Sequence, residues 1–213
     1  MQMELTLETI ETALGLPDFD VLTAHRQMMP TARNGRRPPT KTGRPRIGCV
    51  MLLLYCHEEQ FHIVLTRRRE NLNAHAGQIS FPGGRLEPGE TFVETALRET
   101  HEEIGVAPET VQLLGELSSI YIPPSDFEVH PFVGWVAHGR PPSFIPQESE
   151  VAEVLQVPLS HLLNPETRKV GCREFQGTPV EIPYFDVDGH VVWGATAIML
   201  SEFVERLRLC LTA

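Results

Sequence analysis

Carboxylates and glycines are concentrated in residues 84–106, at spacings that suit a divalent metal ion held against a diphosphate. The residues concerned are Gly84, Glu90, Arg98, Glu99, Glu102, Glu103 and Gly105. Hard ions such as Mg²⁺ and Mn²⁺ prefer carboxylate oxygens and share their coordination shell with water and with substrate phosphate. We therefore expect this segment to bind one or more such ions beside a phosphate group.

A helix is expected to position these carboxylates. Thr91 followed by Glu94 forms a capping box at its start, and Gly105 is a typical helix stop, which leaves about four turns between them. One face of the helix is expected to pack, and it carries Val93, Ala96, Leu97, Thr100 and Ile104. The opposite face, expected at the surface, carries Glu99, Glu102 and Glu103.

The acidic face has two explanations, a solvated charged surface or a bound cation. Like charges at i, i+3 and i+4 spacing destabilise a helix by about a few tenths of a kcal/mol per pair, which favours the cation. Arg98 is expected to orient the cluster by pairing with Glu90 or with Glu102 one turn later. Before the helix, Pro82, Gly83 and Gly84 predict a sharp turn that lets the backbone approach a ligand closely.

The whole pattern resembles the Nudix box, which runs from Gly84 through Arg98 and Glu99 to Gly105 and an apolar residue. Thr100 departs from it, at a position where an apolar residue is usual. The resemblance implies an α/β fold, an α/β/α sandwich with a mixed sheet. It also implies an enzyme that hydrolyses diphosphate linkages with the help of Mg²⁺ or Mn²⁺.

Roles for individual residues follow from the same resemblance. The ion would be held by Glu99, Glu102, Glu103 and the carbonyl oxygen of Gly84. Glu150 lies on a later loop, where Nudix enzymes often carry a further glutamate, and either Glu150 or Glu99 would take the proton of the attacking water. Arg98 would complete the catalytic group.

Residues 64–84 resemble the signature that precedes the box in the coenzyme A diphosphatase branch of the family. Eight residues are in register: Leu65, Thr66, Arg68, Gly77, Phe81, Pro82, Gly83 and Gly84. Arg69 and Asn73 depart, the second where a cation is expected. HAGQ (75–78), EVAEVLQVPL (150–159) and VWGATA (192–197) also resemble that branch. The resemblance implies substrate contacts by Arg68, Arg69, Phe81 and Gly83, and cleavage of coenzyme A to 4′-phosphopantetheine and 3′,5′-adenosine diphosphate.

Three alternatives stay open at this stage. A Nudix pyrophosphatase for ADP-ribose, dinucleotides or nucleoside triphosphates would share the box, and Asn73 favours it. A non-catalytic, nucleotide-sensing regulator would tend to lose glutamates that this chain keeps. An enzyme acting on RNA 5′ ends would need a more basic surface than a net charge of −10 provides.

Composition sets the remaining expectations. With 213 residues, of which 41% are hydrophobic, the chain can bury a sizeable core. The negative charge disfavours nucleic acid as a partner and favours a small nucleotide diphosphate neutralised by metal. No apolar run suggests a membrane span or signal sequence, and the four cysteines lack metal-ligand spacing, so we expect a cytoplasmic protein.

Two regions are expected, an N-terminal helical segment with a basic linker (1–45) and a catalytic domain (46–213). Acidic residues are absent between Asp20 and Glu58, and this basic arm could approach the substrate or a second subunit in a homodimer. Hydrophobic patterns predict helices over residues 5–14, 19–29 and 195–211. They predict strands over 47–55, 61–66, 111–117, 128–137, 184–187 and 190–193.

Overall fold

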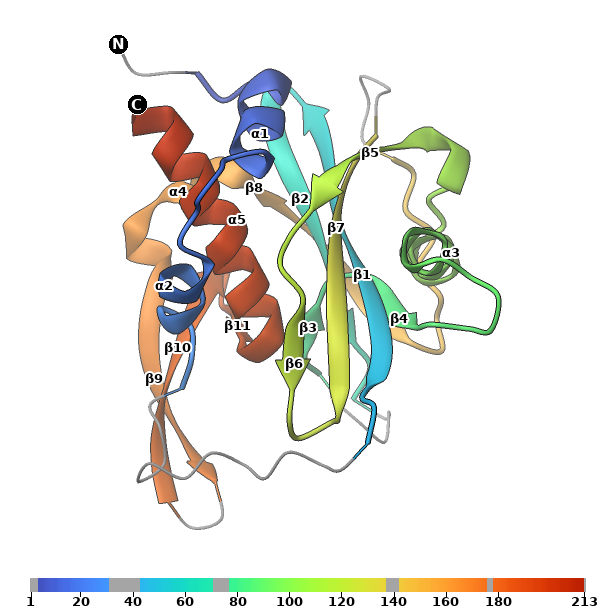
Figure 1. Ribbon diagram of the computed structural model, residues 1–213. Coiled ribbons are helices and arrows are strands. Elements are labelled where there is room, and N and C mark those ends of the chain that lie inside the picture. The colour runs from blue at the N-terminus through green and yellow to red at the C-terminus, as the bar shows by residue number, and fades with distance from the viewer. Residues whose placement is uncertain (1–3, 31–42, 71–76, 137–141, 176–177, 213) are drawn as a thin grey trace.

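A computed structural model describes residues 4–30, 43–70, 77–136, 142–175 and 178–212 (Figure 1). The helices are α1 (Leu7–Leu14), α2 (Val21–Arg26), α3 (Phe92–Ile104), α4 (Leu159–Leu163) and α5 (Gly194–Thr212), with 3-10 turns at Pro108–Thr110 and Pro165–Thr167. The first strands are β1 (Arg46–His57), β2 (Gln60–Arg68), β3 (Ile79–Ser80), β4 (Gly83–Arg85), β5 (Val111–Glu116) and β6 (Ile120–Ile122). The others are β7 (Phe127–Val136), β8 (Val151–Pro158), β9 (Arg168–Phe175), β10 (Thr178–Val187) and β11 (His190–Trp193).

Within the described residues, a mixed sheet of eight strands is built around β1. β1 pairs with β7 in parallel, from Arg46 opposite Phe127 to Tyr55 opposite Val136. It pairs antiparallel with β2 at one end and with β4 at the other. Residues 51–55 are all buried, as expected for a strand covered on both faces.

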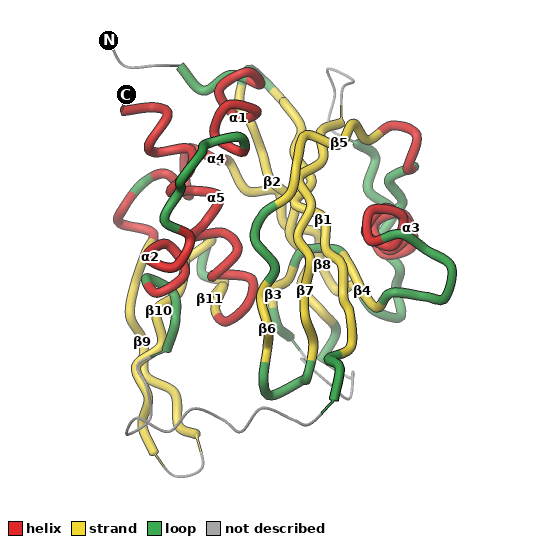
Figure 2. The backbone as a smooth tube through the Cα atoms, viewed as in Figure 1, coloured by secondary structure: helices red, strands yellow, loops and turns green. Residues whose placement is uncertain are grey.

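The two faces of this sheet carry different layers (Figure 2). α3 covers one face, and Ala96 and Ile104 pack there against β1. The other face is covered by α5, with α1, α2 and the three-stranded sheet β11-β10-β9 beside it (Figure 1). Leu200, Phe203 and Leu207 of α5 are fully buried in the larger core. The expected mixed sheet between helices is therefore confirmed.

The N-terminal helices pack against α5. Ser201 donates a hydrogen bond of 2.7 Å to the carbonyl oxygen of Ala24, and the side chains of Ile10 and Met28 belong to the larger core. Residues 31–42, which contain most of the basic arm, lie outside the described residues, and the boundary at residue 45 stays a prediction. No helix in the described part of the chain is long and apolar enough to cross a membrane.

Candidate active site

The turn before α3 needs glycine at two successive positions. Gly83 has φ +155°, and a Cβ there would lie 2.3 Å from the carbonyl oxygen of Cys49 on β1. A Cβ on Gly84 would lie 2.3 Å from Oε1 of Glu99. Strand β4, which was expected as part of a turn, pairs with β1 and so brings the backbone at residue 84 against the Glu99 carboxylate.

The capping box holds the start of α3 as expected. The Thr91 hydroxyl accepts from the backbone N–H of Glu94, whose carboxylate accepts from the N–H of Thr91 at 2.7 Å. At the other end, Gly105 adopts a left-handed conformation with φ 76°, and its N–H donates to the carbonyl oxygen of His101. Both ends of the helix that carries the acidic residues are thus fixed by local hydrogen bonds.

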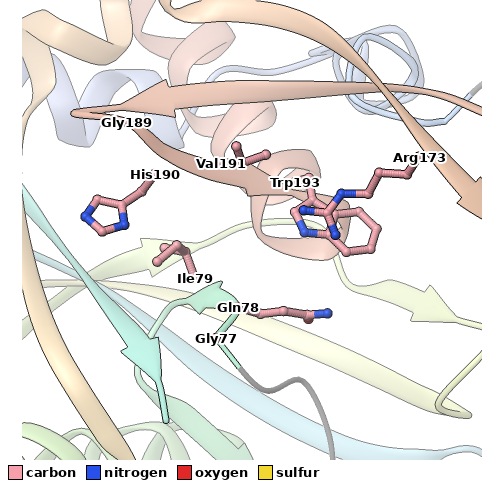
Figure 3. A pocket seen from close by; sticks show the side chains of 8 residues that line it. All are labelled: Gly77, Gln78, Ile79, Arg173, Gly189, His190, Val191 and Trp193. Atoms are coloured by element: carbon pink, nitrogen blue, oxygen red, sulfur yellow. The ribbon is translucent and has the colours of Figure 1, made fainter. Parts of the chain in front are cut away.

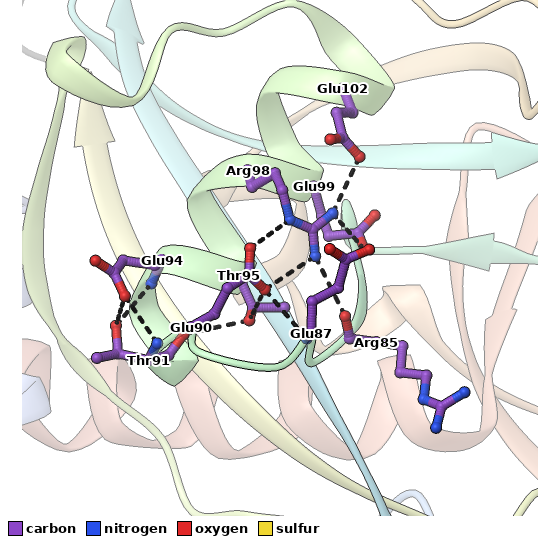
Figure 4. A network of polar contacts seen from close by, with 9 residues as sticks. All are labelled: Arg85, Glu87, Glu90, Thr91, Glu94, Thr95, Arg98, Glu99 and Glu102. Atoms are coloured by element: carbon purple, nitrogen blue, oxygen red, sulfur yellow. Dashed lines mark hydrogen bonds and ion pairs between the residues drawn. The ribbon is translucent and has the colours of Figure 1, made fainter.

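Arg98 is the centre of the polar network on this helix (Figure 4). Its Nε and Nη2 donate to the two carboxylate oxygens of Glu90, at 2.6 and 3.2 Å. Nη1 lies 3.0 Å from Oε1 of Glu99 and 3.0 Å from Oε2 of Glu102. Nη2 also donates to the carbonyl oxygen of Arg85, at 3.2 Å. Pairing with Glu90 or Glu102 was expected, and both pairs are present.

Glu90 belongs to this network as a fixed anion. Hydrogen bonds from Arg98 and then from the Thr95 hydroxyl lower the pKa of Glu90 to about 2. The backbone N–H of Glu87 also donates to the Glu90 carboxylate, at 3.2 Å. Because its oxygens are already engaged, Glu90 serves to anchor Arg98 rather than to take part in proton transfer.

Glu103 is buried, contrary to the expectation of a surface face. The residue is 4% exposed, and Nη1 of Arg68 lies 3.6 Å from its Oε1. Its Oε2 is buried and has no hydrogen-bond partner among the described residues. Burial, opposed by Arg68 and reinforced by the negative charges of Glu99 and Glu150, raises the pKa of Glu103 to about 8.

Glu99 and Glu102 differ in their surroundings. The Glu99 side chain is 17% exposed, and the Glu102 side chain is 56% exposed. Burial raises the pKa of Glu99, the hydrogen bond from Arg98 opposes that rise, and the charges of Glu102 and Glu150 add to it. Carboxylates that repel one another in a half-buried place favour a cation between them.

Glu150 lies beside this cluster although it is far away in sequence. The backbone N–H of Arg69 donates to the carbonyl oxygen of Glu150 at 2.9 Å, and that of Gln147 donates to the carbonyl oxygen of Glu103 at 2.8 Å. These bonds fasten the loop before β8 to β2 and to the end of α3. The charge of Glu150 therefore acts on Glu99 and Glu103.

The expected substrate residues are not all available to a ligand. Arg68 and Gly83 are partly exposed beside the acidic cluster, and Arg69 is exposed. Phe81 is 2% exposed and packs in the larger core, so its ring supports the turn and does not offer a surface for substrate. Asn73, where the upstream signature departs, lies outside the described residues.

Comparison with known proteins decides the family. A family model described as the NUDIX domain matches residues 45–174. The chain belongs to the Nudix family. Nudix hydrolase 3 of Caenorhabditis elegans is 34% identical over 176 residues, which cover 74% of this chain and 72% of that protein. The protein named Uncharacterized Nudix hydrolase NudL of Pectobacterium atrosepticum is 38% identical over 204 residues, covering 92% and 96%.

The fold of this chain also resembles that of a solved structure. The crystal structure of the MutT protein from Methanosarcina mazei Go1 matches with a TM-score of 0.50 at 21% identity, over 79% of this chain and 97% of that one. At that identity, the likeness concerns the architecture alone. The chain is therefore a Nudix hydrolase, an enzyme that acts on diphosphate linkages, built on a mixed α/β fold.

The acidic residues of this Nudix hydrolase suit a divalent ion in their chemistry. The buried Oε2 of Glu103, which no described residue hydrogen-bonds, and the Glu99 carboxylate against the Gly84 backbone are hard oxygen ligands of the required type. Among the described residues, no three acidic, histidine or cysteine side chains already converge on one point that could hold an ion. Mg²⁺ commonly takes only one or two protein carboxylates, so a site for this ion does not need three side chains that already converge.

A second polar group, which the sequence did not reveal, lies where β2 and β8 meet the second sheet. Nε of Arg67 donates to Glu153 at 3.0 Å, and Nε2 of His190 lies 3.9 Å from the same carboxylate. Arg173 on β9 stacks over Trp193 on β11, with 4.5 Å from the guanidinium carbon to the ring centroid. Strand β9, which carries Arg173, was not predicted from the sequence, so its pairing with Trp193 was not expected.

Proposed function

We propose that this Nudix hydrolase cleaves coenzyme A or its acyl esters within the diphosphate. Water attacks one phosphorus atom, the P–O–P bond breaks, and 4′-phosphopantetheine and 3′,5′-adenosine diphosphate leave. The observation that carries the proposal is the position of Arg68. This arginine of the upstream signature reaches the box glutamates, with Nη1 3.6 Å from Oε1 of Glu103.

The proposal assigns metal binding to Glu99, Glu102 and Glu103, with the carbonyl oxygen of Gly84. A bound Mg²⁺ or Mn²⁺ would supply positive charge to the phosphoryl oxygens and make water more acidic. Arg98 keeps Glu99 and Glu102 in place through the pairs at 3.0 Å. It acts as a positioning residue, because its donors are engaged with glutamates and with a backbone carbonyl oxygen.

Glu150 is proposed to take the proton of the attacking water. Glu150 is exposed, and it lies on the loop before β8, which is held against the end of α3 and against β2 by backbone hydrogen bonds. These features suit a group that must meet both water and substrate. Glu99 is the alternative base, because burial raises its pKa.

Arg68 and Arg69 are proposed to contact the substrate phosphates. Arg68 is only partly engaged by Glu103 at 3.6 Å, which is longer than a hydrogen bond, so its donors can turn to a phosphate. Arginine binds phosphate through paired N–H donors. A cytoplasmic location and a homodimer remain predictions that accompany this proposal.

A second candidate substrate class is ADP-ribose or dinucleotides, favoured by Asn73 where the coenzyme A signature has a cation. One experiment separates the two. Purified protein is assayed with Mg²⁺ and with Mn²⁺ on coenzyme A, acetyl-coenzyme A, dephospho-coenzyme A, ADP-ribose and a dinucleotide. The proposal requires coenzyme A or its ester to have the highest kcat/KM.

Arg68→Ala adds a test of the residue that carries the proposal. Loss of a charge-assisted phosphate contact should lower kcat/KM on coenzyme A by about ten- to a hundredfold. Arg67→Ala is the matched control, since the neighbouring guanidinium pairs with Glu153 instead of the box glutamates. A strong preference for ADP-ribose, with the Arg68 variant affecting all substrates equally, would reject coenzyme A and leave the Nudix assignment intact.

A further inference from the structure

A hollow of about 250 Å³ lies between β3 of the main sheet and β11 of the second sheet (Figure 3). Gln78 and Ile79 line it from the main sheet, and Arg173, His190 and Trp193 line it from the second sheet. In Figure 3 the Gln78 side chain extends below the Arg173–Trp193 pair, and His190 lies at the other end. Two walls that are far apart in sequence thus enclose a space with a cation, an aromatic ring and an amide.

The Arg173–Trp193 pair gives this hollow its chemistry. The guanidinium carbon lies 4.5 Å from the centroid of the indole ring, and Arg173 is exposed. A guanidinium stacked in this way keeps its N–H edge for a phosphate, while its plane and the ring offer a surface for a flat base. In a chain with a net charge of −10, an exposed cation held in place by stacking is suited to an anionic ligand.

The hollow is connected to the acidic cluster by a single residue. The backbone N–H of Arg68 donates to the carbonyl oxygen of Gln78 at 3.0 Å, while Nη1 of Arg68 lies 3.6 Å from Glu103. Adjacent strands are about 4.8 Å apart, so the wall of the hollow and the residue that faces the glutamates are neighbours in the sheet. A substrate held at its diphosphate by the cluster can extend one arm to this wall.

We infer that the hollow binds the nucleoside end of the substrate, a planar base together with a phosphate on its ribose. Its volume is below the roughly 300–1,000 Å³ of pockets that enclose a drug-sized ligand, which fits one arm of a coenzyme and not the whole. Arg173 contacts the ribose phosphate, the base stacks on the Arg173–Trp193 pair, and the Gln78 amide faces the base edge. The inference rests on the proposed function for the identity of the arm.

Tryptophan fluorescence tests the inference without any turnover. The chain has two tryptophans, and the ring of Trp135 contacts that of Phe61 in a tilted arrangement, with 5.4 Å between the ring centroids. Titration with 3′,5′-adenosine diphosphate should quench the tryptophan emission of the wild type and of Trp135→Phe. Both proteins keep Trp193, on which the bound base stacks. Trp193→Phe should show no quenching.

Arg173→Gln then tests the phosphate contact. We expect about a tenfold or greater rise in Kd for 3′,5′-adenosine diphosphate and little change for 5′-AMP, which lacks the 3′-phosphate. KM for coenzyme A should rise with kcat nearly unchanged, because the contact is made to the ribose phosphate and not to the diphosphate that is cleaved. Lys169→Gln is the matched control. It removes a cation from the same strand, β9, but this lysine pairs with Asp186 and does not line the hollow.

The outcomes separate this inference from the proposed function. Turnover of coenzyme A without quenching by 3′,5′-adenosine diphosphate, or with equal affinity in wild type and Arg173→Gln, overturns the inference and leaves the function standing. Quenching that depends on Trp193 and Arg173, in a protein that does not hydrolyse coenzyme A, supports the nucleoside site and rejects the coenzyme A assignment.

Discussion

The carboxylate of Glu99 occupies the space that a side chain at Gly84 would need. A Cβ on Gly84 would lie 2.3 Å from Oε1 and 2.6 Å from Oε2 of Glu99. Glycine at this position therefore does more than permit a turn, since its lack of a side chain lets a glutamate of α3 reach the backbone of β4. The close approach of Glu99 to the Gly84 backbone places the first carboxylate of the acidic cluster beside β4.

Gly84→Ala is expected to impair catalysis more than folding. The added methyl group must displace the flexible Glu99 side chain, and a shift of about 1 Å in a catalytic group can cost about a hundredfold in rate. The melting temperature and kcat/KM should be measured together. Gly15→Ala is the control, because its Cβ would lie 3.6 Å from the nearest atom, an ordinary contact. Near-normal activity of Gly84→Ala would show that Glu99 need not lie against residue 84.

Glu103→Gln should keep or raise the stability of the ion-free protein while removing activity. The buried carboxylate has one oxygen without a hydrogen-bond partner in the described part of the chain and a pKa of about 8, so a neutral side chain of similar shape costs little there. Loss of a metal ligand should lower kcat by about a hundredfold or more. Mg²⁺ or Mn²⁺ should raise the melting temperature of the wild type, and this increment should shrink in the variant.

Glu102→Gln provides the exposed counterpart on the same helix. Glu102 is 56% exposed and pairs with Arg98, so its loss should leave stability nearly unchanged and lower activity. If both glutamine variants turned over substrate normally and kept the ion-induced rise in melting temperature, neither carboxylate would be a metal ligand.

Local signals explain how much of the fold the sequence predicts. The capping box at Thr91 and Glu94 fixes structure through bonds within a few residues, and it is found as predicted. The predicted strands 184–187 and 190–193 are likewise found, paired through a tight turn at Asp188–Gly189. Strand β8 was not predicted, although its burial alternates in part along the chain. Strand β9, with an exposed Val170 and charged neighbours, gives no hydrophobic pattern to detect.

The candidate site shows the limit of helical periodicity. Periodicity placed Glu103 opposite the apolar face and therefore at the surface. Its burial comes from Arg68 on β2 and from the loop whose Gln147 N–H donates to its carbonyl oxygen. Those contacts come from segments that are distant in sequence, and one helix cannot reveal them. The sequence of a single segment cannot reveal the hollow either, because its two walls meet only when the second sheet packs against the first.

Glu150→Gln should separate proton transfer from binding. If Glu150 is the base, the variant should bind metal and substrate with nearly normal affinity, while kcat falls and the acidic limb of the pH profile of kcat/KM changes. That limb reports the loss of activity when the base becomes protonated. The comparison requires pH profiles of wild type and variant over the same range. An unchanged acidic limb would transfer the role to Glu99.

A buried ionic network on the opposite side of the sheet should control the acid stability of the protein. Glu202 on α5 is completely buried and accepts from His25 of α2 at 2.8 Å and from Nη2 of Arg206 at 3.0 Å. The N–H and hydroxyl of Ser118 also donate to it. Burial alone would raise the pKa of Glu202, but these hydrogen bonds together lower it below the usual value.

Glu202→Gln is expected to destabilise the protein by about 3–5 kcal/mol at neutral pH, because it leaves the buried Arg206 guanidinium without its anion. A carboxyl group with a lowered pKa in the folded state contributes stability above its unfolded value, and this contribution is lost as the pH falls through the folded value. The gap in unfolding free energy between wild type and variant should therefore be largest near neutrality and should narrow below about pH 4.3. Urea denaturation at several pH values measures it, with the exposed Glu11→Gln as the control. A gap that stayed constant down to pH 3, or a Glu202 variant as stable as the Glu11 variant, would mean that the network does not stabilise the fold through its charge.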